Sequence, residues 1–252
     1  MKTAVITGAS AGLGLEFVAQ LESFYPEIES VWLIARSADK LQNAALLLKN
    51  AKAKILSLDL CLEEGLDAFE EEVKKENPEI FLLVNNAGCG HLANIGDTDY
   101  RTQTRMVDLN IRALTAVSNI CVPYIADGGK IINVSSIASF CPNPRMTVYS
   151  ASKSYVSAFS CGLGEELHSR GISVTAVCSG PMSTEFLDIA GIRGNSKTFD
   201  MLPYCVPNKV VSGAYKASIR GKSVHTPRAF YKFYRFLAKI LPQCIMVKFS
   251  KT

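Results

Sequence analysis

Long apolar segments are absent from this 252-residue chain. Its apolar runs are short, such as residues 80–84, whereas a helix that spans a membrane needs about 20 predominantly apolar residues. The pattern of a cleavable signal peptide is absent too, because a strand-like run begins at Thr3 and a glycine-rich turn follows it. We therefore expect a cytoplasmic protein that does not span a membrane.

Metal-binding and disulfide patterns are also absent. The eight cysteines include no C-x-x-C pair, and none of the three histidines forms a cluster with them. We expect free thiols that pack as small apolar side chains in a reducing compartment, and no bound metal. His91 belongs to no nucleophile or metal pattern. It follows residues 85–90 and could line the active-site pocket, but we expect it in a surface loop.

What is present is an alternation of apolar runs and helical patterns. The expected strands are residues 3–7, 31–35, 54–58, 80–84, 130–134 and 173–177, and the expected helices are about 13–24, 38–50, 63–76, 100–125 and 150–170. Nearly continuous Val, Ile and Leu in the strands is typical of a parallel sheet that is buried on both faces. The predicted fold class is α/β, a single doubly wound parallel sheet of the Rossmann type, and the chain length fits one domain over residues 1–252.

The pattern loosens after Gly180. Residues 182–208 are predicted to form a substrate loop, and residues 225–252 a basic aromatic C-terminal extension with a helix at about 228–241 that ends the fold as a lid. Residues 201–252 hold ten Lys or Arg and no Asp or Glu, whereas residues 1–200 hold 17 basic and 23 acidic residues. The extension can roof the active site, pack at a subunit boundary or contact an anionic membrane peripherally, and its charge would attract an anionic substrate.

A glycine-rich turn separates the first strand from the first helix. Glycines at positions 8, 12 and 14 allow a tight turn that a dinucleotide pyrophosphate can approach, and the helix N-terminus behind them favours negative charge. The second strand ends at Arg36 and Ser37, where a Rossmann domain meets the adenosine ribose. Arginine there suits a 2′-phosphate, so the sequence predicts NADP(H) in preference to NAD(H).

Four further motifs follow in order: residues 85–88 (Asn-Asn-Ala-Gly), Asn110, the pair Ser135–Ser136, and Tyr149 with Lys153 four residues later. Together with the glycine turn they resemble the short-chain dehydrogenase/reductase family, over residues 2 to about 184. The spacing of Tyr149 and Lys153 places both side chains on one face of a helix. An ammonium group and an oxidised nicotinamide would both lower the pKa of the tyrosine towards the working range.

The resemblance implies a catalytic set of Asn110, Ser136, Tyr149 and Lys153. Tyr149 would exchange a proton with the substrate oxygen, Ser136 would orient and polarise the carbonyl, Lys153 would hold the nicotinamide ribose, and Asn110 would fix a water that relays protons to Lys153. The cofactor-binding positions from the turn and the resemblance are Gly8, Ser10, Gly12, Leu13, Gly14, Arg36, Ser37, Asp59, Asn86, Ala87, Gly88, Asn110, Tyr149, Lys153, Gly180 and Thr184. Two departures are Ser179 in place of a proline, and Ala11 where many NADP-preferring members carry a basic residue.

The sequence thus predicts a reversible oxidoreductase that interconverts a ketone and a secondary alcohol. Apolar residues near the active site suggest a steroid-like or fatty-acyl-like substrate, with Phe140, Met182, Phe186 and Phe199 as candidate contacts. The family resemblance implies a homodimer or homotetramer, and its motifs argue against nucleic acid as a partner. The alternative is a protein of the same fold that senses NADP without turnover or acts as a membrane-peripheral interaction module.

Overall fold

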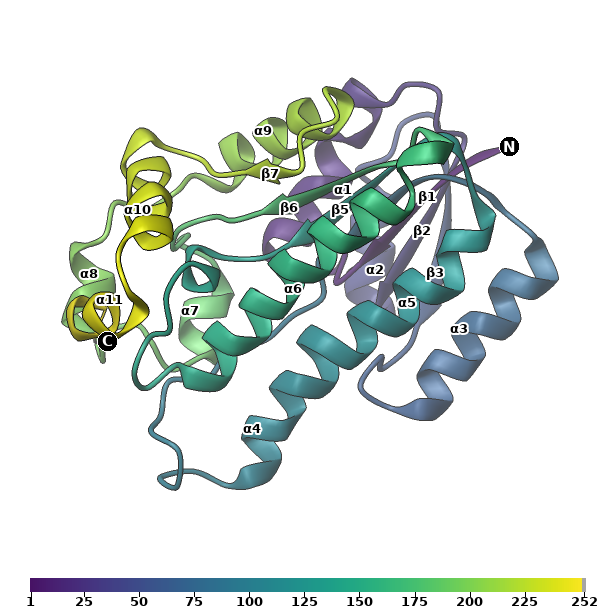
Figure 1. The fold of residues 1–252 in the computed structure, drawn as a ribbon. Coiled ribbons are helices and arrows are strands. Elements are labelled where there is room, and N and C mark those ends of the chain that lie inside the picture. Colours follow the sequence, from purple (N-terminus) through teal and green to yellow (C-terminus); the bar gives the residue numbers. More distant parts are fainter. Residues whose placement is uncertain (251–252) are drawn as a thin grey trace.

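Among residues 1–250, which the computed structural model describes, seven strands form one parallel sheet. They are β1 (Lys2–Thr7), β2 (Ser30–Ala35), β3 (Lys52–Ser57), β4 (Glu79–Asn85), β5 (Ile125–Val134), β6 (Ser173–Val177) and β7 (Val224–His225). Their spatial order is β3-β2-β1-β4-β5-β6-β7 (Figure 1). The order reverses between β1 and β4, which makes the sheet doubly wound and confirms the predicted fold class.

Helices cover both faces of the sheet (Figure 1). The main ones are α1 (Gly12–Phe24), α2 (Ala38–Ala45), α3 (Glu63–Glu76), α4 (Tyr100–Val107), α5 (Leu114–Cys121), α6 (Thr147–Glu166) and α9 (Pro207–Ile219). A π-helical segment, η1 (Asp108–Ala113), joins α4 to α5. Helices α1, α2 and α9 pack on one face, and α3, α5 and α6 pack on the other.

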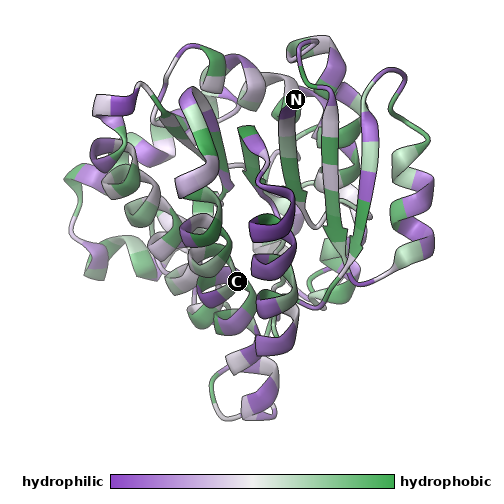
Figure 2. Cartoon of the chain, turned by 90° about the vertical axis from the view of Figure 1, so that its right-hand side faces the viewer, coloured by the Kyte–Doolittle hydropathy of each residue, from purple (hydrophilic) through white to green (hydrophobic). Residues whose placement is uncertain are grey.

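The core is divided into two layers by the strands. Along β1, Ala4 and Ile6 point towards the α1 side, whereas Val5 points towards the α3 side. Because successive strand residues face opposite sides, burial on both faces requires apolar residues at nearly every position. Figure 2 shows this pattern: the strands are mostly hydrophobic, while the outer helices mix hydrophobic and hydrophilic residues.

The six predicted strands and the first five helical regions are present, with shifts at their ends. The two-residue strand β7 and the helix α9 were not predicted. The segment 182–208 contains two short helices, α7 (Glu185–Ile189) and α8 (Lys197–Met201), and a bridge pairs Met182 with Cys205.

The C-terminal extension forms α10 (Ala229–Ile240) and α11 (Gln243–Phe249), while its last residues, 251–252, lie outside the described part of the chain. Both helices lie at the end of the molecule opposite the N-terminus (Figure 1). Within residues 1–250, no helix has the length and apolar character needed to cross a membrane.

Candidate active site

The glycine turn lies at the carboxyl end of β1, beside the point where the strand order reverses. Gly8 and Gly12 have positive φ angles of 64° and 54°, which glycine adopts without strain. A Cβ on Gly14 would lie 2.0 Å from the Gly8 carbonyl oxygen, so only glycine allows this close return of the chain. No side chain caps the N-terminus of α1, which therefore presents backbone N–H groups to a ligand.

Hydrogen bonds tie this turn to the end of β4. The Thr7 hydroxyl accepts from the backbone N–H groups of Asn86 and Ala87, at 3.0 and 3.1 Å. The Asn86 amide in turn donates to the carbonyl oxygens of Thr7 and Gly8, both at 3.1 Å. The predicted Asn-Asn-Ala-Gly motif therefore stabilises the glycine turn from the neighbouring strand.

Basic and acidic side chains surround the far end of the same cleft. Arg36 is exposed after β2, and Ser37 caps α2 by accepting from the Lys40 N–H at 3.4 Å. Asp59 accepts from the Cys61 N–H and the Arg105 guanidinium, each at 3.0 Å. Partial burial opposes ionisation of Asp59, but these two donors outweigh it and lower its pKa.

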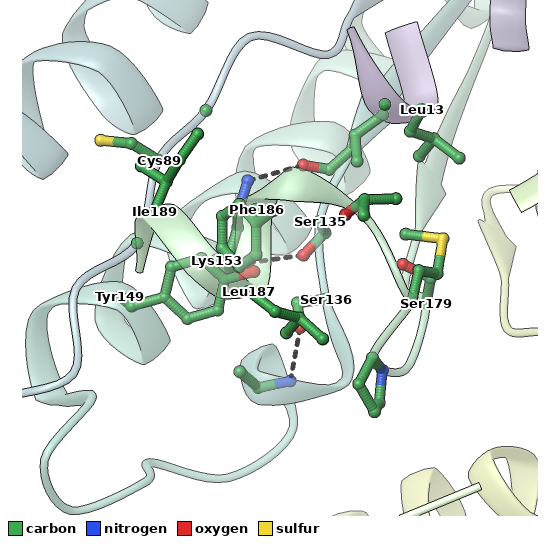
Figure 3. A pocket seen from close by; sticks show the side chains of 18 of the residues that line it. Leu13, Cys89, Ser135, Ser136, Tyr149, Lys153, Ser179, Phe186, Leu187 and Ile189 are labelled. Carbon is green, nitrogen blue, oxygen red and sulfur yellow. Dashed lines mark hydrogen bonds between the residues drawn. The ribbon is translucent and has the colours of Figure 1, made fainter. Parts of the chain in front are cut away.

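Tyr149, Ser136 and Lys153 gather at the other end of the cleft (Figure 3). Tyr149 and Lys153 share α6, and the Lys153 ammonium nitrogen lies 5.8 Å from the centre of the Tyr149 ring. Lys153 Nζ donates to the Val134 carbonyl at 2.9 Å, at the end of β5. Ser136 follows that strand, and its Oγ accepts from the Ala138 N–H at 3.2 Å.

Burial dominates the ionisation of both groups on α6. Desolvation raises the pKa of Tyr149 to about 12, while hydrogen bonding from Ser136 acts in the opposite direction. Desolvation also lowers the pKa of Lys153 to about 8. The expected lowering of the tyrosine pKa depends on an oxidised nicotinamide as well as on Lys153, and it stays a prediction.

Asn110 lies in the π-helical segment η1 and is 1% exposed. Its side chain accepts from the Cys89 N–H at 2.9 Å and donates to the Cys89 carbonyl at 2.9 Å and to Ser152 Oγ at 3.0 Å. A Cβ on Gly88 would lie 3.1 Å from Asn110 Oδ1 and 3.2 Å from Lys153 Nζ. Asn110 therefore holds the loop after β4 next to Lys153.

One cavity of about 1230 Å³ connects the two ends. A single ligand site typically occupies about 300–1,000 Å³, so this volume leaves room for a dinucleotide and a second molecule. Of the predicted cofactor and catalytic residues, all except Gly14 and Asn110 line it. His91 also lines the cavity, from the irregular segment that follows β4, which was the alternative to a purely surface position.

Three of the four predicted substrate contacts, Met182, Phe186 and Phe199, line the cavity. Phe186 packs against Tyr149 with ring centroids 5.8 Å apart, and Figure 3 shows it next to the phenol ring. The fourth predicted contact, Phe140, does not line the cavity, and we correct that prediction here. Its ring packs against Tyr234 of α10, 6.2 Å between centroids, and lies near the Arg235 guanidinium.

The C-terminal extension supplies cavity residues that we did not predict as contacts from the sequence: Phe230, Tyr231, Tyr234, Leu237, Leu241, Met246 and Ser250. Tyr231 is fully buried and donates to the Pro203 carbonyl at 2.8 Å, and a Cβ on Gly180 would collide with its ring. The extension therefore roofs the site, which was one of the three predicted roles. The spacing of residues 230, 234, 237 and 241 marks one helical face and was a usable signal.

Comparisons with known proteins agree with this geometry. Residues 2–190 match the family model for short chain dehydrogenases, so the chain belongs to the short-chain dehydrogenase family and is an oxidoreductase of that family. Uncharacterised oxidoreductases of Staphylococcus epidermidis and Staphylococcus aureus are each 31% identical over 185 residues, which cover 73% of this chain and 79% of theirs.

Solved structures of the family have the same fold. A short-chain dehydrogenase from Sphingobium yanoikuyae in complex with NADPH is 26% identical, with a TM-score of 0.79, over 96% of this chain and 97% of that one. A bulky-bulky ketone specific alcohol dehydrogenase from Comamonas testosteroni is 25% identical, with a TM-score of 0.76, over 98% and 94%.

Proposed function

We propose that this protein interconverts a bulky apolar ketone and the corresponding secondary alcohol with NADP(H). The observation that carries the proposal is the placement of Tyr149. Its buried phenol lies beside Ser136 and Lys153, at the junction between the glycine-lined cleft and the apolar part of the same cavity. A carbonyl compound in the apolar part would meet a proton donor there.

The cleft fits a nicotinamide dinucleotide. The crowded turn at Gly8 and Gly14 and the uncapped start of α1 form a cradle for the pyrophosphate. Asp59 and Asn86 to Gly88 would lie along the adenosine, and Thr184 beside the carboxamide. The bound cofactor would supply or accept the hydride, as nicotinamides do.

The chain's own residues would handle the proton. Tyr149 is protonated at neutral pH, since burial raises its pKa to about 12, and it would donate its proton to the carbonyl oxygen. Ser136 would donate a second hydrogen bond to the same oxygen. Lys153 carries its charge below a pKa of about 8 and would hold the nicotinamide ribose. The water-mediated relay through Asn110 stays a prediction.

The preference for NADP(H) depends on Arg36. This side chain is exposed at the cavity, and within residues 1–250 no carboxylate lies within ion-pair distance of it. A free guanidinium suits a 2′-phosphate. Lys40 lines the cavity as well, but pairs with Glu185 at 3.8 Å. The bound NADPH in the Sphingobium relative is consistent with this preference.

The substrate side supports a large apolar molecule, steroid-like or fatty-acyl-like. Side chains from three segments line it: Met182, Phe186, Leu187, Phe199, Leu202, Tyr234 and Leu237. Apolar surroundings favour an apolar ligand, and Tyr149 and Ser136 provide the polar contacts that orient it. The bulky ketones named for the Comamonas relative are of the same kind.

The test is a screen of absorbance at 340 nm with steroids, bile acids and acyl ketones, each with NADPH and with NADH. We expect turnover of at least one bulky ketone and faster turnover with NADPH. Wild-type protein that binds neither cofactor would contradict the proposal. Protein that prefers NADH would contradict the role of Arg36 but not that of Tyr149.

A further inference from the structure

The helix α10 presents two different apolar faces. Its inner face carries Tyr231, Tyr234 and Leu237, which line the cavity. A second face carries Phe233, Phe236 and Ile240, which are 60%, 57% and 62% exposed. Spacings of three and four residues place these last three in one stripe on the outside of the helix. We call them the outer stripe.

Leaving the apolar side chains of the outer stripe in water is unfavourable in free energy unless a binding partner covers them. Single exposed apolar residues are ordinary, but two phenylalanines and an isoleucine in one row on an outer helix mark an interaction site. Ile245 of α11, which is also exposed, lies beyond the end of this helix. The outer stripe therefore suits a binding partner, and the charged residues around it indicate the chemistry of that partner.

Lysine side chains flank the outer stripe. Lys232 and Lys239 are exposed on α10 and lie on the side of the outer stripe away from the cavity face. In the described part of the chain, none of the nine basic residues from Lys209 to Lys248 lies within ion-pair distance of a carboxylate. The sequence offers no acidic residue between positions 201 and 252.

We propose that the outer stripe and its lysines dock on an anionic lipid surface. A short helix with an apolar face and flanking lysines inserts its apolar side chains among acyl chains and leaves the ammonium groups at the headgroups. A second copy of this chain fits less well. A two-fold contact through this face would bring two segments together that hold only positive charges.

The proposal also gives a route for the substrate, and this part rests on the proposed function. The inner face of α10 lines the cavity while its outer stripe meets the lipid, so one helix separates the bilayer from the apolar part of the site. An apolar ketone dissolved in the membrane would enter beside this helix without crossing bulk water.

The experiment is sedimentation of the full chain with vesicles of phosphatidylcholine alone and of phosphatidylcholine with 30% phosphatidylglycerol. We expect binding to the anionic vesicles and little to the neutral ones, with loss of binding near 1 M salt, where screening reaches only about 3 Å. The double variant Lys232→Glu/Lys239→Glu should lower the partition coefficient at least about tenfold, since each surface cation contributes strongly to anionic membrane binding. Phe233→Ser/Phe236→Ser should lower it similarly.

The matched control is Lys209→Glu/Lys216→Glu. It changes the net charge by the same amount at two exposed positions of α9, away from the outer stripe. We expect it to retain at least half of the binding. An equal loss in this control, or no binding of wild type at low salt, would overturn the proposal. So would a change from dimer to monomer in Phe233→Ser/Phe236→Ser without vesicle binding by wild type, because the face would then join subunits. Turnover of a water-soluble ketone tests the proposed function separately.

Discussion

Tyr149 and Lys153 share one buried environment that favours the uncharged form of each. Burial raises the pKa of the phenol to about 12 and lowers the pKa of the ammonium to about 8. The phenol therefore keeps its proton at neutral pH, while the lysine is charged only below mildly alkaline pH. In the reverse direction the tyrosine must lose its proton, which requires positive charge close to it.

Replacing Tyr149 with Phe keeps the ring and removes the transferable proton. We expect kcat for ketone reduction to fall at least about 10²-fold, the lower range for general acid catalysis, with cofactor binding retained. Stopped-flow or steady-state rates and a fluorescence titration with NADPH measure the two quantities. Tyr155→Phe is the matched control, because Tyr155 lies on the same helix and bonds to Thr115 instead. Near-normal turnover in a folded Tyr149→Phe variant would remove this residue from the mechanism.

The depressed pKa of Lys153 makes a prediction about stability. Between about pH 8 and the ordinary value of 10.5, the folded chain has released this proton while the unfolded chain still holds it. Because the unfolded state then binds more protons, the stability of wild type relative to Lys153→Met should rise with pH across this window. The expected gain is on the order of 3 kcal/mol.

Urea unfolding of both proteins at several pH values from 7 to 10.5 measures this gain. The comparison cancels all other titrating groups, and the lost hydrogen bond to Val134 gives only a constant offset. A difference between the two proteins that is flat with pH would mean that Lys153 is not desolvated.

In the proposed function, Arg36 sets the preference for NADP(H) over NAD(H). Arg36→Asp should weaken NADPH binding about tenfold or more, since a hydrogen bond to a charged group contributes about 1.5–3 kcal/mol and the new carboxylate adds repulsion. Binding of NADH should change much less. Isothermal titration with both cofactors measures the ratio. Arg220→Asp, with the same charge change at an exposed position that does not line the cavity, should leave that ratio unchanged.

At the scale of elements, the turn from β1 to α1 tolerates no side chain at Gly14. A Cβ there would lie 2.0 Å from the Gly8 carbonyl and 2.6 Å from the Asn86 amide nitrogen. We expect Gly14→Ala to displace the turn, weaken the binding of both cofactors more than tenfold and lower stability by roughly 1–3 kcal/mol.

Gly162→Ala provides the comparison for that variant. Gly162 lies inside α6, with open space where a Cβ would be. Alanine there should stabilise the chain by up to about 1 kcal/mol and leave cofactor binding intact. Thermal unfolding measures the stability of both variants, and titration measures their affinity for the cofactors. If Gly14→Ala bound cofactor like wild type, the turn would not be the pyrophosphate site.

Strands with continuous apolar runs could be predicted from the sequence, whereas strand β7 and helix α9 could not. The strand that ends at Ala35 is apolar at every position after Ser30, so its pattern is unambiguous. Strand β7 has two residues, Val224 and His225, which is too short for any period, and its pairing to β6 alone defines it. Helix α9 was hidden by Pro207, which we interpreted as part of a loop although it begins the helix.

The candidate site likewise contains residues that could be placed from the sequence and residues that could not. Residues near the ends of strands, such as Ser136 and Asn86, could be placed because parallel strands bring their carboxyl ends to one edge. Tyr231 could not be placed, because its contact with Gly180 joins residues that are 51 positions apart. The strand pairings within that segment are the bridge between Met182 and Cys205 and the two-residue strand β7, and both are too short to show in the sequence pattern. Phe140 was misplaced for the same reason, since the position of α10 decides what covers it.

At the scale of the whole molecule, one cavity runs from the glycine turn to the C-terminal helices. Its two ends are formed largely by different parts of the chain. The ends of β1, β2 and β4 line one part, and residues from position 136 onwards contribute Ser136, Tyr149 and the apolar walls. Tyr149 lies where they meet. We propose that a hydride and a proton reach one carbonyl group at this junction.

The most direct test follows deuterium from NADPH that is deuterated at its transferable position. After incubation of the wild-type protein with a bulky ketone, mass spectrometry of the product should find one deuterium at the carbinol carbon. The Tyr149→Phe variant, matched in bound cofactor, should give at least about 10²-fold less product in the same time. Alcohol without deuterium at that carbon, or equal yield from the variant, would contradict the account.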